Sequence, residues 1–295
     1  MHLLSIDDLD KSIILHLLSR TNDMKTLTSK PFQHRILTLL MYEPSTRTSG
    51  SFQAAMLKLG GSVLNIPIEM SSVQKGETLH DTLRTVCCYS DIVVMRHPQI
   101  ESIEAAKVAT KPILNAGNGA GEHPTQALLD LYTIQEELGR LHDITVTFVG
   151  DLTYGRTVHS LVRLLVLFPN IRFKYVSSLP MPPTLVDYVS SLGIEQQCTT
   201  LEEALPESDV VYMTRIQKER VEFQGKPECL NAEKMKLAKQ HMIVMHPFPR
   251  NEELSTDIDT DPRSVYFKQL NHGMYMRMAI LEYYLSKEYG ATSYS

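Results

Sequence analysis

The sequence predicts an α/β protein with two doubly wound parallel-sheet domains joined by long helices. Three observations predict this class. Apolar runs of strand length alternate with segments of helical periodicity, the order found in parallel sheets covered by helices on both faces. The alternation pauses at one long helical segment, 123–138, and then restarts. The 295 residues, 43% of them hydrophobic, are sufficient for two cores of ordinary size.

The first half of the chain is expected to open with a helix. Ser5 and Asp8 have the spacing of a capping box, and the apolar residues after them recur at helical intervals. Short apolar runs then predict strands at 36–41, 63–66, 92–95 and 112–115. The intervening patterns predict helices from Arg47 to the glycine pair at 60–61, over 77–89 and over 100–109. We expect loops at 67–76 and 115–122.

The second half repeats the alternation after a long helix over 123–138, with Pro124 in its first turn. Apolar runs predict strands at 144–149, 173–176, 210–213 and 242–245. Helical patterns occupy 157–167, 183–192 and 274–289. We therefore expect a first domain at 1–138, a second at 139–270, and a C-terminal helix at 271–295 that returns to the first domain.

The composition argues against several classes of protein. The net charge of −5 provides no overall basic field to attract nucleic acid or an anionic membrane surface. No apolar run reaches the about 18 residues that a membrane span needs, and the N-terminus lacks the pattern of a leader peptide. The four cysteines form no Cys-x-x-Cys pair, so we expect no zinc site, reduced thiols and a cytoplasmic location.

The segment from Glu43 to Thr48 lies where a predicted strand turns into a predicted helix. Ser45, Thr46 and Thr48 offer hydroxyls that can cap the helix, and Arg47 adds a guanidinium. The first-turn N–H groups of a helix lack intrahelical partners and carry the positive end of its dipole. Two readings are open at this point: an anion site, most naturally for phosphate, or an ordinary cap with one surface arginine.

Other predicted strands also end in arginine, histidine, threonine or glutamine. The segments that follow them are 96–98, 123–126, 150–156, 214–217 and 246–250. Open α/β sheets bind ligands beyond the carboxyl ends of their strands, so four converging arginines predict a small ligand with several negative charges. Simpler roles stay open for three residues: His97 and Arg250 as caps or partners of surface carboxylates, and His246 as a satisfied core histidine.

Several kinds of chemistry at these strand ends are excluded because the sequence lacks the motifs that they require. There is no His-x-x-x-His metal pattern, no Gly-x-Ser-x-Gly elbow and no suggested Cys-His pair. The segment 150–156 resembles half of a dinucleotide fingerprint, but the G-x-G-x-x-G spacing is absent. We expect no metal and no cofactor, and direct group transfer in a cleft that stabilises anions through preorganised donors.

These segments resemble the motifs of the aspartate/ornithine transcarbamoylase family. Ser45-Thr46-Arg47-Thr48 resembles its carbamoyl-phosphate signature, and the next two blocks resemble 95–98 and 123–126. The segment 71–77, which contains Lys75, resembles its mobile loop. The segments 151–160, 213–220 and 246–250 are similar to the aspartate-specific members, whereas ornithine-specific members would show a Cys near position 248 and a Ser-Met-Gly loop. The resemblance covers nearly the whole chain.

The resemblance implies a site between the two domains, with catalytic roles for Arg47, Thr48, Lys75, Arg96 and His123. The carbamoyl-phosphate site would comprise Ser45, Thr46, Arg47, Thr48, Ser71, Lys75, Arg96, His123, Gln126, Pro247 and Phe248. In that set, Thr48, Arg96 and His123 would donate to the carbonyl oxygen, and Gln126 with two backbone carbonyls would orient the amino group. The carboxylates of L-aspartate would be bound by Lys75, Arg156, Arg215 and Gln217.

The resemblance also implies partners and an assembly. The substrates would be carbamoyl phosphate and L-aspartate, and the assembly a homotrimer in which Ser71 and Lys75 reach into the neighbour's site. Glu43 would pair with Arg156 and Arg220 as the domains close. Whether regulatory chains or fusion partners join the trimer is left open. Two alternatives remain: carbamoyl transfer to another amino acid such as ornithine, and a non-catalytic homologue that binds phosphate and serves a regulatory role.

Overall fold

The structure is a computed structural model of the 295-residue chain, and it describes residues 1–68, 71–218, 220–223 and 225–290. The chain divides into two compact units. Unit 1 combines residues 1–129 with 270–295, and unit 2 comprises residues 130–269. The sequence placed the first boundary at the end of the helix Pro124–Leu138 (α5), whereas the units change over within this helix, after Leu129.

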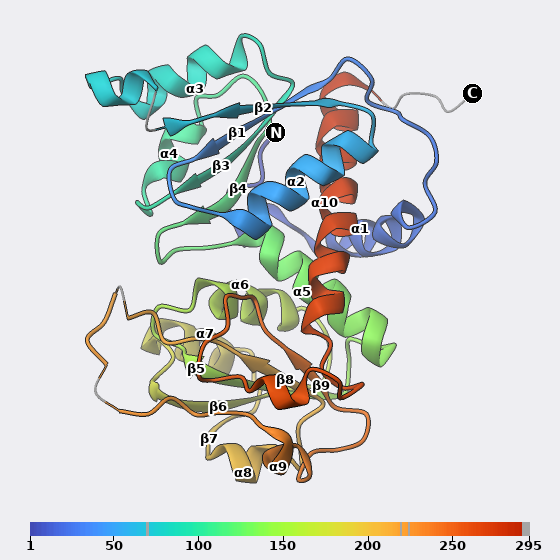
Figure 1. The fold of residues 1–295 in the computed structure, drawn as a ribbon, viewed down its shortest axis with the longest axis vertical. Coiled ribbons are helices and arrows are strands. Elements are labelled where there is room, and N and C mark those ends of the chain that lie inside the picture. The colour runs from blue at the N-terminus through green and yellow to red at the C-terminus, as the bar shows by residue number, and fades with distance from the viewer. Residues whose placement is uncertain (69–70, 219, 224, 291–295) are drawn as a thin grey trace. The chain divides into compact units, whose positions relative to one another are not determined.

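Unit 1 is built on a four-stranded parallel sheet in the order β2-β1-β3-β4 (Figure 1). Its strands are β1 (Ile36–Met41), β2 (Ser62–Ile66), β3 (Ile92–His97) and β4 (Ile113–Asn118). Its helices are η1 (Ile6–Asp8), α1 (Lys11–Met24), α2 (Thr46–Lys58), η3 (Ser72–Lys75), α3 (Leu79–Cys87), α4 (Ser102–Ala106), the start of α5 and most of α10 (Tyr266–Tyr289).

Both faces of this sheet are covered, as expected for parallel strands. On one face, the apolar side chains of β1, β3 and β4 pack against those of α3 and α4. Figure 1 shows α2 and α10 on the other side, where Arg277 of α10 lies 5.1 Å from the ring centroid of Phe52 in α2. The capping box predicted at Ser5 and Asp8 is present and begins η1.

The two ends of the chain meet in unit 1. The Arg20 guanidinium of α1 makes two hydrogen bonds, of 2.6 and 2.8 Å, to the Glu282 carboxylate of α10. Near the end of α10, the Arg35 guanidinium lies 3.7 Å from the centroid of the Tyr289 ring, which is within the range of a cation–π contact. The last helix therefore belongs to the same core as the first strands.

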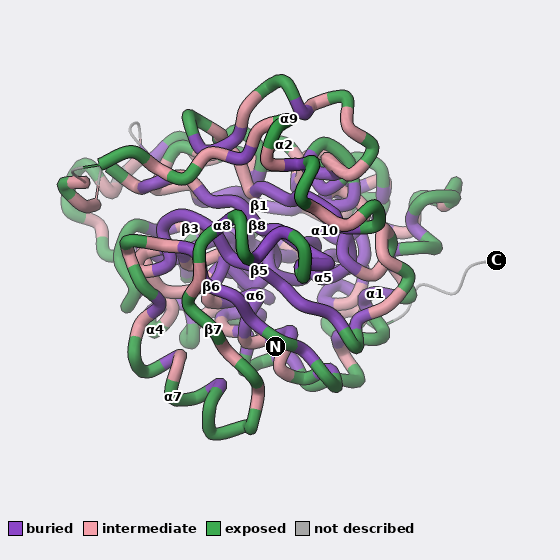
Figure 2. The backbone as a smooth tube through the Cα atoms, turned by 90° about the horizontal axis from the view of Figure 1, so that it is seen from below, coloured by how far each residue is buried: buried purple, intermediate pink, exposed green. Residues whose placement is uncertain are grey.

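Unit 2 is built on a five-stranded parallel sheet in the order β7-β6-β5-β8-β9. Its strands are β5 (Ile144–Asp151), β6 (Ile171–Leu179), β7 (Gln196–Cys198), β8 (Val210–Met213) and β9 (Ile243–Met245). Its helices include α6 (Arg156–Leu165), α7 (Pro183–Ser191), α8 (Leu201–Ala204), α9 (Ala232–Met235) and η4 (Thr256–Ile258). The central strand, β5, is buried along its whole length, whereas the edge strands β2 and β7 contain no buried residue (Figure 2).

The predicted fold class, two parallel sheets with flanking helices, is confirmed. The sequence placed the start of the last helix at residue 274, but α10 begins at Tyr266. The short elements β7, α8 and α9 were not predicted, because three or four residues are too few to show a period. None of the described helices is both long and apolar enough to cross a membrane.

Candidate active site

In unit 1, neighbouring strands bring three of the predicted segments to one edge of the sheet. Met41 at the end of β1 is in register with Arg96 of β3, and the Tyr42 N–H donates to the Arg96 carbonyl at 2.9 Å. His97 of β3 is in register with Asn118 of β4, after which the chain leads to His123. The exits of β1, β3 and β4 are therefore adjacent, as the strand-exit argument predicted.

The turn after β1 leads directly into α2, whose N-cap residue is Ser45. An ordinary hydroxyl cap was one of the two readings left open for this segment, and Ser45 makes no side-chain capping hydrogen bond. The first turn also contains no acidic residue that would interact with the positive end of the helix. Thr48 is buried and Arg47 is exposed. This arrangement favours the anion site over the ordinary cap.

The Arg96 side chain is held in place by an acidic neighbour. Its Nε donates to the Glu43 carboxylate at 3.1 Å, and both side chains are about one-fifth exposed. The contacts of His97 differ from the helix cap or surface-carboxylate partner considered for it: its ring packs on Tyr42, with 4.6 Å between centroids, and its Nδ1 accepts the Gln99 N–H at 3.1 Å. Burial lowers the pKa of His97, so this imidazole is neutral near pH 7.

The remaining predicted residues of unit 1 lie in two segments. His123 and Gln126 are buried at the start of α5, and the His123 carbonyl accepts the Gln126 N–H at 3.0 Å. Ser71 donates its hydroxyl to the Ile68 carbonyl at 2.8 Å, and Lys75 is exposed at the end of η3. The structure thus places His123 and Gln126 beside the β4 exit, and Ser71 and Lys75 on a separate surface segment.

In unit 2, β5, β8 and β9 are consecutive neighbours in the sheet, and the predicted residues follow their ends. Arg156 is the first residue of α6, just after β5, and is half-buried. Arg215 and Gln217 follow β8, and Pro247 and Phe248 follow β9. The predicted aspartate-binding and amino-group-binding residues of this unit therefore share one edge of its sheet.

Two family models match the chain, one over each half. The model described as the carbamoyl-phosphate-binding domain of aspartate/ornithine carbamoyltransferase matches residues 1–136, and the one described as the aspartate/ornithine-binding domain matches residues 142–284. The chain belongs to the aspartate/ornithine carbamoyltransferase family.

Relatives of this carbamoyltransferase-family chain include single-function and multifunctional proteins. The aspartate carbamoyltransferase catalytic subunit of Archaeoglobus fulgidus is 44% identical, over 95% of this chain and 97% of the relative. The multifunctional protein CAD of Squalus acanthias is 47% identical over 97% of this chain, which spans only 13% of that protein's length.

Solved structures of aspartate transcarbamoylase from Trypanosoma cruzi have the same fold. The complex with carbamoyl phosphate and aspartate superimposes with a TM-score of 0.90 at 46% identity, covering 95% of each chain. The complex with carbamoyl aspartate and phosphate has a TM-score of 0.89 at 48% identity, covering 94% of this chain and 93% of that one.

Sequence reasoning missed one residue at the carbamoyltransferase site edge, the buried Asp151 at the end of β5. Its carboxylate accepts the Tyr154 N–H at 2.9 Å, the Gln217 N–H at 3.3 Å and the Gln217 Nε2 at 3.4 Å. Gln217 Nε2 also donates to the Tyr154 carbonyl at 2.9 Å. Asp151 thus ties the loop before α6 to the segment after β8. The signal in the sequence was a carboxylate at the end of a strand whose neighbouring exits are mostly basic or neutral.

Arg250 and His246 have the structural roles considered for them in the sequence: Arg250 pairs with a carboxylate, and His246 is a core histidine with satisfied hydrogen bonds. Arg250 forms a bidentate ion pair with the Asp259 carboxylate, in which Nη2 donates to Oδ2 at 2.7 Å. His246 is fully buried, and both of its ring nitrogens have partners, Glu253 and the Phe248 N–H. Both ring nitrogens of His246 are therefore occupied by protein partners, and Arg250 is held by a carboxylate of its own unit.

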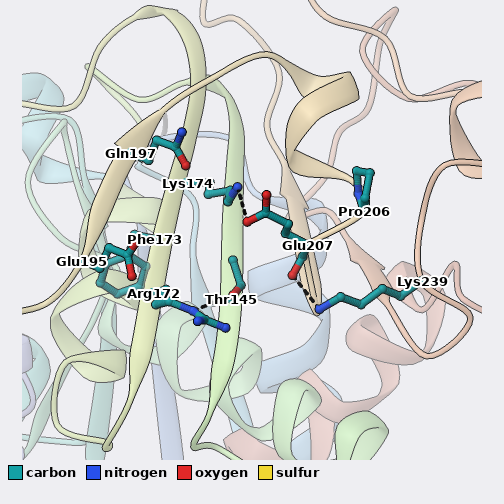
Figure 3. A pocket seen from close by; sticks show the side chains of 9 residues that line it. All are labelled: Thr145, Arg172, Phe173, Lys174, Glu195, Gln197, Pro206, Glu207 and Lys239. Carbon is teal, nitrogen blue, oxygen red and sulfur yellow. Dashed lines mark hydrogen bonds and ion pairs between the residues drawn. The ribbon is translucent and has the colours of Figure 1, made fainter.

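A cavity of about 240 Å³ in unit 2 lies away from this carbamoyltransferase site edge (Figure 3). It is lined by residues near the amino ends of β5 and β6, including Thr145, Arg172 and Lys174. Lys174 is largely buried and pairs with Glu207 at 2.7 Å (Figure 3). Because the strand exits lie at the opposite edge of the sheet, this cavity contains none of the predicted substrate-binding residues.

Proposed function

We propose that the chain transfers the carbamoyl group of carbamoyl phosphate to the amine of L-aspartate, giving N-carbamoyl-L-aspartate and phosphate, a step of pyrimidine biosynthesis. The observation that carries the proposal is the 46% identity, over 95% of the chain, to a structure solved with carbamoyl phosphate and aspartate. The chain also has strand exits rich in arginine, which suit ligands with several negative charges.

On the carbamoyl-phosphate side, the phosphate is held at the start of α2 by Ser45, Thr46, Arg47 and Thr48. The lack of a side-chain cap at Ser45 supports this role, because the first-turn N–H groups can then donate to phosphate oxygens. The carbonyl oxygen is held by Thr48, Arg96 and His123. Gln126 and the carbonyls of Pro247 and Phe248 accept hydrogen bonds from the carbamoyl amino group.

On the aspartate side, Arg156, Arg215 and Gln217 bind the two carboxylates, together with Lys75. Arginine suits this task because its planar fork matches a carboxylate with two parallel hydrogen bonds. Gln217 Nε2 donates hydrogen bonds to the Asp151 carboxylate and the Tyr154 carbonyl. To bind aspartate, Gln217 replaces one of these hydrogen bonds with one to a substrate carboxylate oxygen.

The reaction proceeds by attack of the neutral aspartate amine on the carbamoyl carbon. The carbonyl oxygen gains negative charge, which is stabilised by donors already in place, each typically worth ~3–4 kcal/mol. The bond between the carbamoyl carbon and the phosphate oxygen then breaks, and the leaving phosphate accepts the amine proton. His123 acts as a neutral donor, and Arg96 is fixed for this task by Glu43 at 3.1 Å.

We further propose a cytoplasmic homotrimer with shared sites, in which Ser71 and Lys75 serve the neighbouring subunit. The exposure of Lys75 in unit 1 supports its role toward a neighbouring subunit. The four cysteines form no disulfide, which suits a reducing compartment such as the cytoplasm. Pairing of Glu43 with Arg156 and Arg220 during closure is part of the same proposal. The multifunctional relatives support fusion partners as one natural context for such a chain.

An acceptor assay tests the proposed activity. With carbamoyl phosphate present, we expect product with L-aspartate and none with ornithine; product with ornithine alone would establish the alternative acceptor. Arg47→Ala and His123→Ala are each expected to lower kcat at least 100-fold while the thermal unfolding temperature stays near that of the parent. Binding of carbamoyl phosphate without product from any amine would instead establish the non-catalytic homologue.

Mixing two inactive variants tests the shared site. Lys75→Ala chains keep Arg47, and Arg47→Ala chains keep Lys75, so a mixed trimer contains interfaces at which both residues are intact. We expect activity to return after the two variants are dissociated and reassembled together. Mixed trimers that form and stay inactive would contradict the sharing of residues between subunits.

A further inference from the structure

The segment after β9 is held from within by the His246 imidazole. His246 is fully buried, its Nδ1 lies 2.8 Å from the Phe248 nitrogen, and its Nε2 lies 2.8 Å from Glu253 Oε1. A backbone N–H can only donate, so Nδ1 must be the acceptor and carries no proton. The proton is therefore on Nε2, which donates to Glu253. His246 is thus a neutral imidazole in a single tautomer.

Glu253 fixes the orientation of the ring. It is 2% exposed, and its Oε1 also accepts the Asn251 N–H at 2.9 Å. Burial by itself raises the pKa of Glu253, but the hydrogen bonds from His246 and the Asn251 N–H outweigh it and hold the pKa below its ordinary value. The carboxylate therefore remains charged and acts as an acceptor that the Nε2–H of His246 must face.

A second buried chain of hydrogen bonds holds the backbone of His246. Gln269 Oε1 accepts the His246 N–H at 3.0 Å, and Gln269 Nε2 donates to Asp130 at 2.6 Å. The other Asp130 oxygen accepts the Tyr212 hydroxyl at 2.7 Å. Because a carboxylate offers only acceptors, Asp130 forces the Gln269 amide to present its oxygen to His246. Side chains of α5, β8 and α10 thereby fix where the segment after β9 begins.

These contacts determine the direction of one carbonyl group. The Pro247–Phe248 peptide is trans, so its C=O and N–H lie in one plane and point in opposite directions. Once the Phe248 N–H is aimed at His246 Nδ1, the Pro247 carbonyl must point away from the buried imidazole. Phe248 itself has a φ of 55°, which is uncommon for a residue other than glycine and needs such support from its surroundings.

We propose that His246 is a positioning residue that, through the Phe248 N–H, aims the Pro247 carbonyl at the carbamoyl amino group. The inference rests on the proposed function, because it assigns the Pro247 carbonyl to substrate. It extends that function to a side chain that touches no substrate. Gln269 and Asp130 support it by fixing the backbone from which the imidazole projects.

Two substitutions separate the tasks of the two ring nitrogens. In His246→Asn the amide oxygen can occupy the place of Nδ1 and accept the Phe248 N–H. In His246→Gln the longer amide reaches the place of Nε2 and can donate to Glu253, but it leaves the Phe248 N–H without its acceptor. We expect His246→Gln to lose about tenfold in kcat/KM for carbamoyl phosphate, and His246→Asn to stay within about threefold of the parent.

Inhibition by inorganic phosphate distinguishes positioning from general damage. Phosphate has no amino group, so its inhibition constant should change less than twofold in both variants. Equal kcat/KM values for His246→Asn and His246→Gln would overturn the inference, as would a parallel loss of phosphate binding. If the unsubstituted protein forms no carbamoyl aspartate, the proposed function is refuted, whereas the buried hydrogen bonds of His246 are unaffected by that result.

The tautomer can be measured without any substitution. In the intact protein labelled with ¹⁵N-histidine, the His246 signals should be those of a neutral ring protonated at Nε2 near pH 7. A ring protonated at Nδ1, or at both nitrogens, would overturn the inference even if neither variant folds.

Discussion

Replacing Asp151 by Asn is expected to weaken the binding of aspartate while leaving the binding of carbamoyl phosphate nearly unchanged. Asp151 is fully buried, and its two carboxylate oxygens accept three N–H groups, one from Tyr154 and two from Gln217. Asn keeps one acceptor oxygen, and its NH₂ group would face N–H donors in place of the other. The loop before α6 and the segment after β8 would then lose their common anchor.

The expected size of the effect comes from the hydrogen bonds that are lost. Hydrogen bonds to a charged acceptor typically contribute about 1.5–3 kcal/mol. The two bonds from Gln217, at 3.3 and 3.4 Å, are long, which places their loss at the lower end of this range. A loss of about 1.4 kcal/mol from aspartate binding corresponds to a tenfold rise in the KM for aspartate.

The assay is steady-state kinetics with each substrate varied in turn, together with the free energy of unfolding in urea. Asp209→Asn is a matched control, because Asp209 is also a buried carboxylate that accepts a backbone N–H, from Thr145 at 2.8 Å, but it precedes β8 at the opposite edge of the same sheet. We expect both variants to lose stability and only Asp151→Asn to raise the KM for aspartate. An unchanged KM in Asp151→Asn, or an equal rise in both, would refute the reasoning.

Two further predictions concern stability. Gly150 has a φ of +111°, and a Cβ there would lie 2.0 Å from the Thr214 carbonyl oxygen, so Gly150→Ala should lower the free energy of unfolding by at least about 2 kcal/mol, measured by thermal unfolding. Gly193 also has a positive φ but has open space around it, so Gly193→Ala should lower the free energy of unfolding less. Equal losses in the two variants would contradict the steric argument. Arg250 holds the pKa of Asp259 at about 2, below its usual 3.8, so this pair stabilises the fold above pH 4 and its contribution is lost as the pH falls towards 2. Arg250→Met should therefore flatten the decline of the unfolding free energy between pH 4 and pH 2, and an unchanged slope would contradict the pairing.

The strands of both sheets, apart from the three-residue β7, could be predicted because parallel strands are short, nearly continuous apolar runs. The start of α10 could not, since its first turns contain Asn271, His272 and Gly273, residues typical of loops. Gly273 lies in a closely packed part of the helix, where a Cβ would come within 2.9 Å of the Arg277 guanidinium and 3.0 Å of the Leu129 side chain. The contact with Leu129 joins residues more than 140 positions apart in the sequence, and no local pattern reports it.

The sequence predicted which residues of the candidate site follow the ends of strands. It did not predict which of those residues contact one another in the folded protein. Arg96 and the turn from Glu43 to Thr48 lie together because the register aligns β1 with β3, a strand order that the sequence analysis did not predict. The roles of Asp151 and Gln269 depend on which donor each side chain meets after folding. A buried polar residue has the same appearance in a sequence whether it anchors a loop or faces a ligand.

The assignment of α10 mostly to unit 1 has a consequence for the order of folding. Unit 2 is continuous in sequence, so all of its residues have been synthesised once position 269 is reached. Unit 1 needs partners from opposite ends of the chain, such as Arg20 and Glu282, which are 262 positions apart in the sequence. Such contacts are slow to form. On the ribosome, unit 1 is thus completed after unit 2, because α10 follows all of unit 2's strands in the sequence.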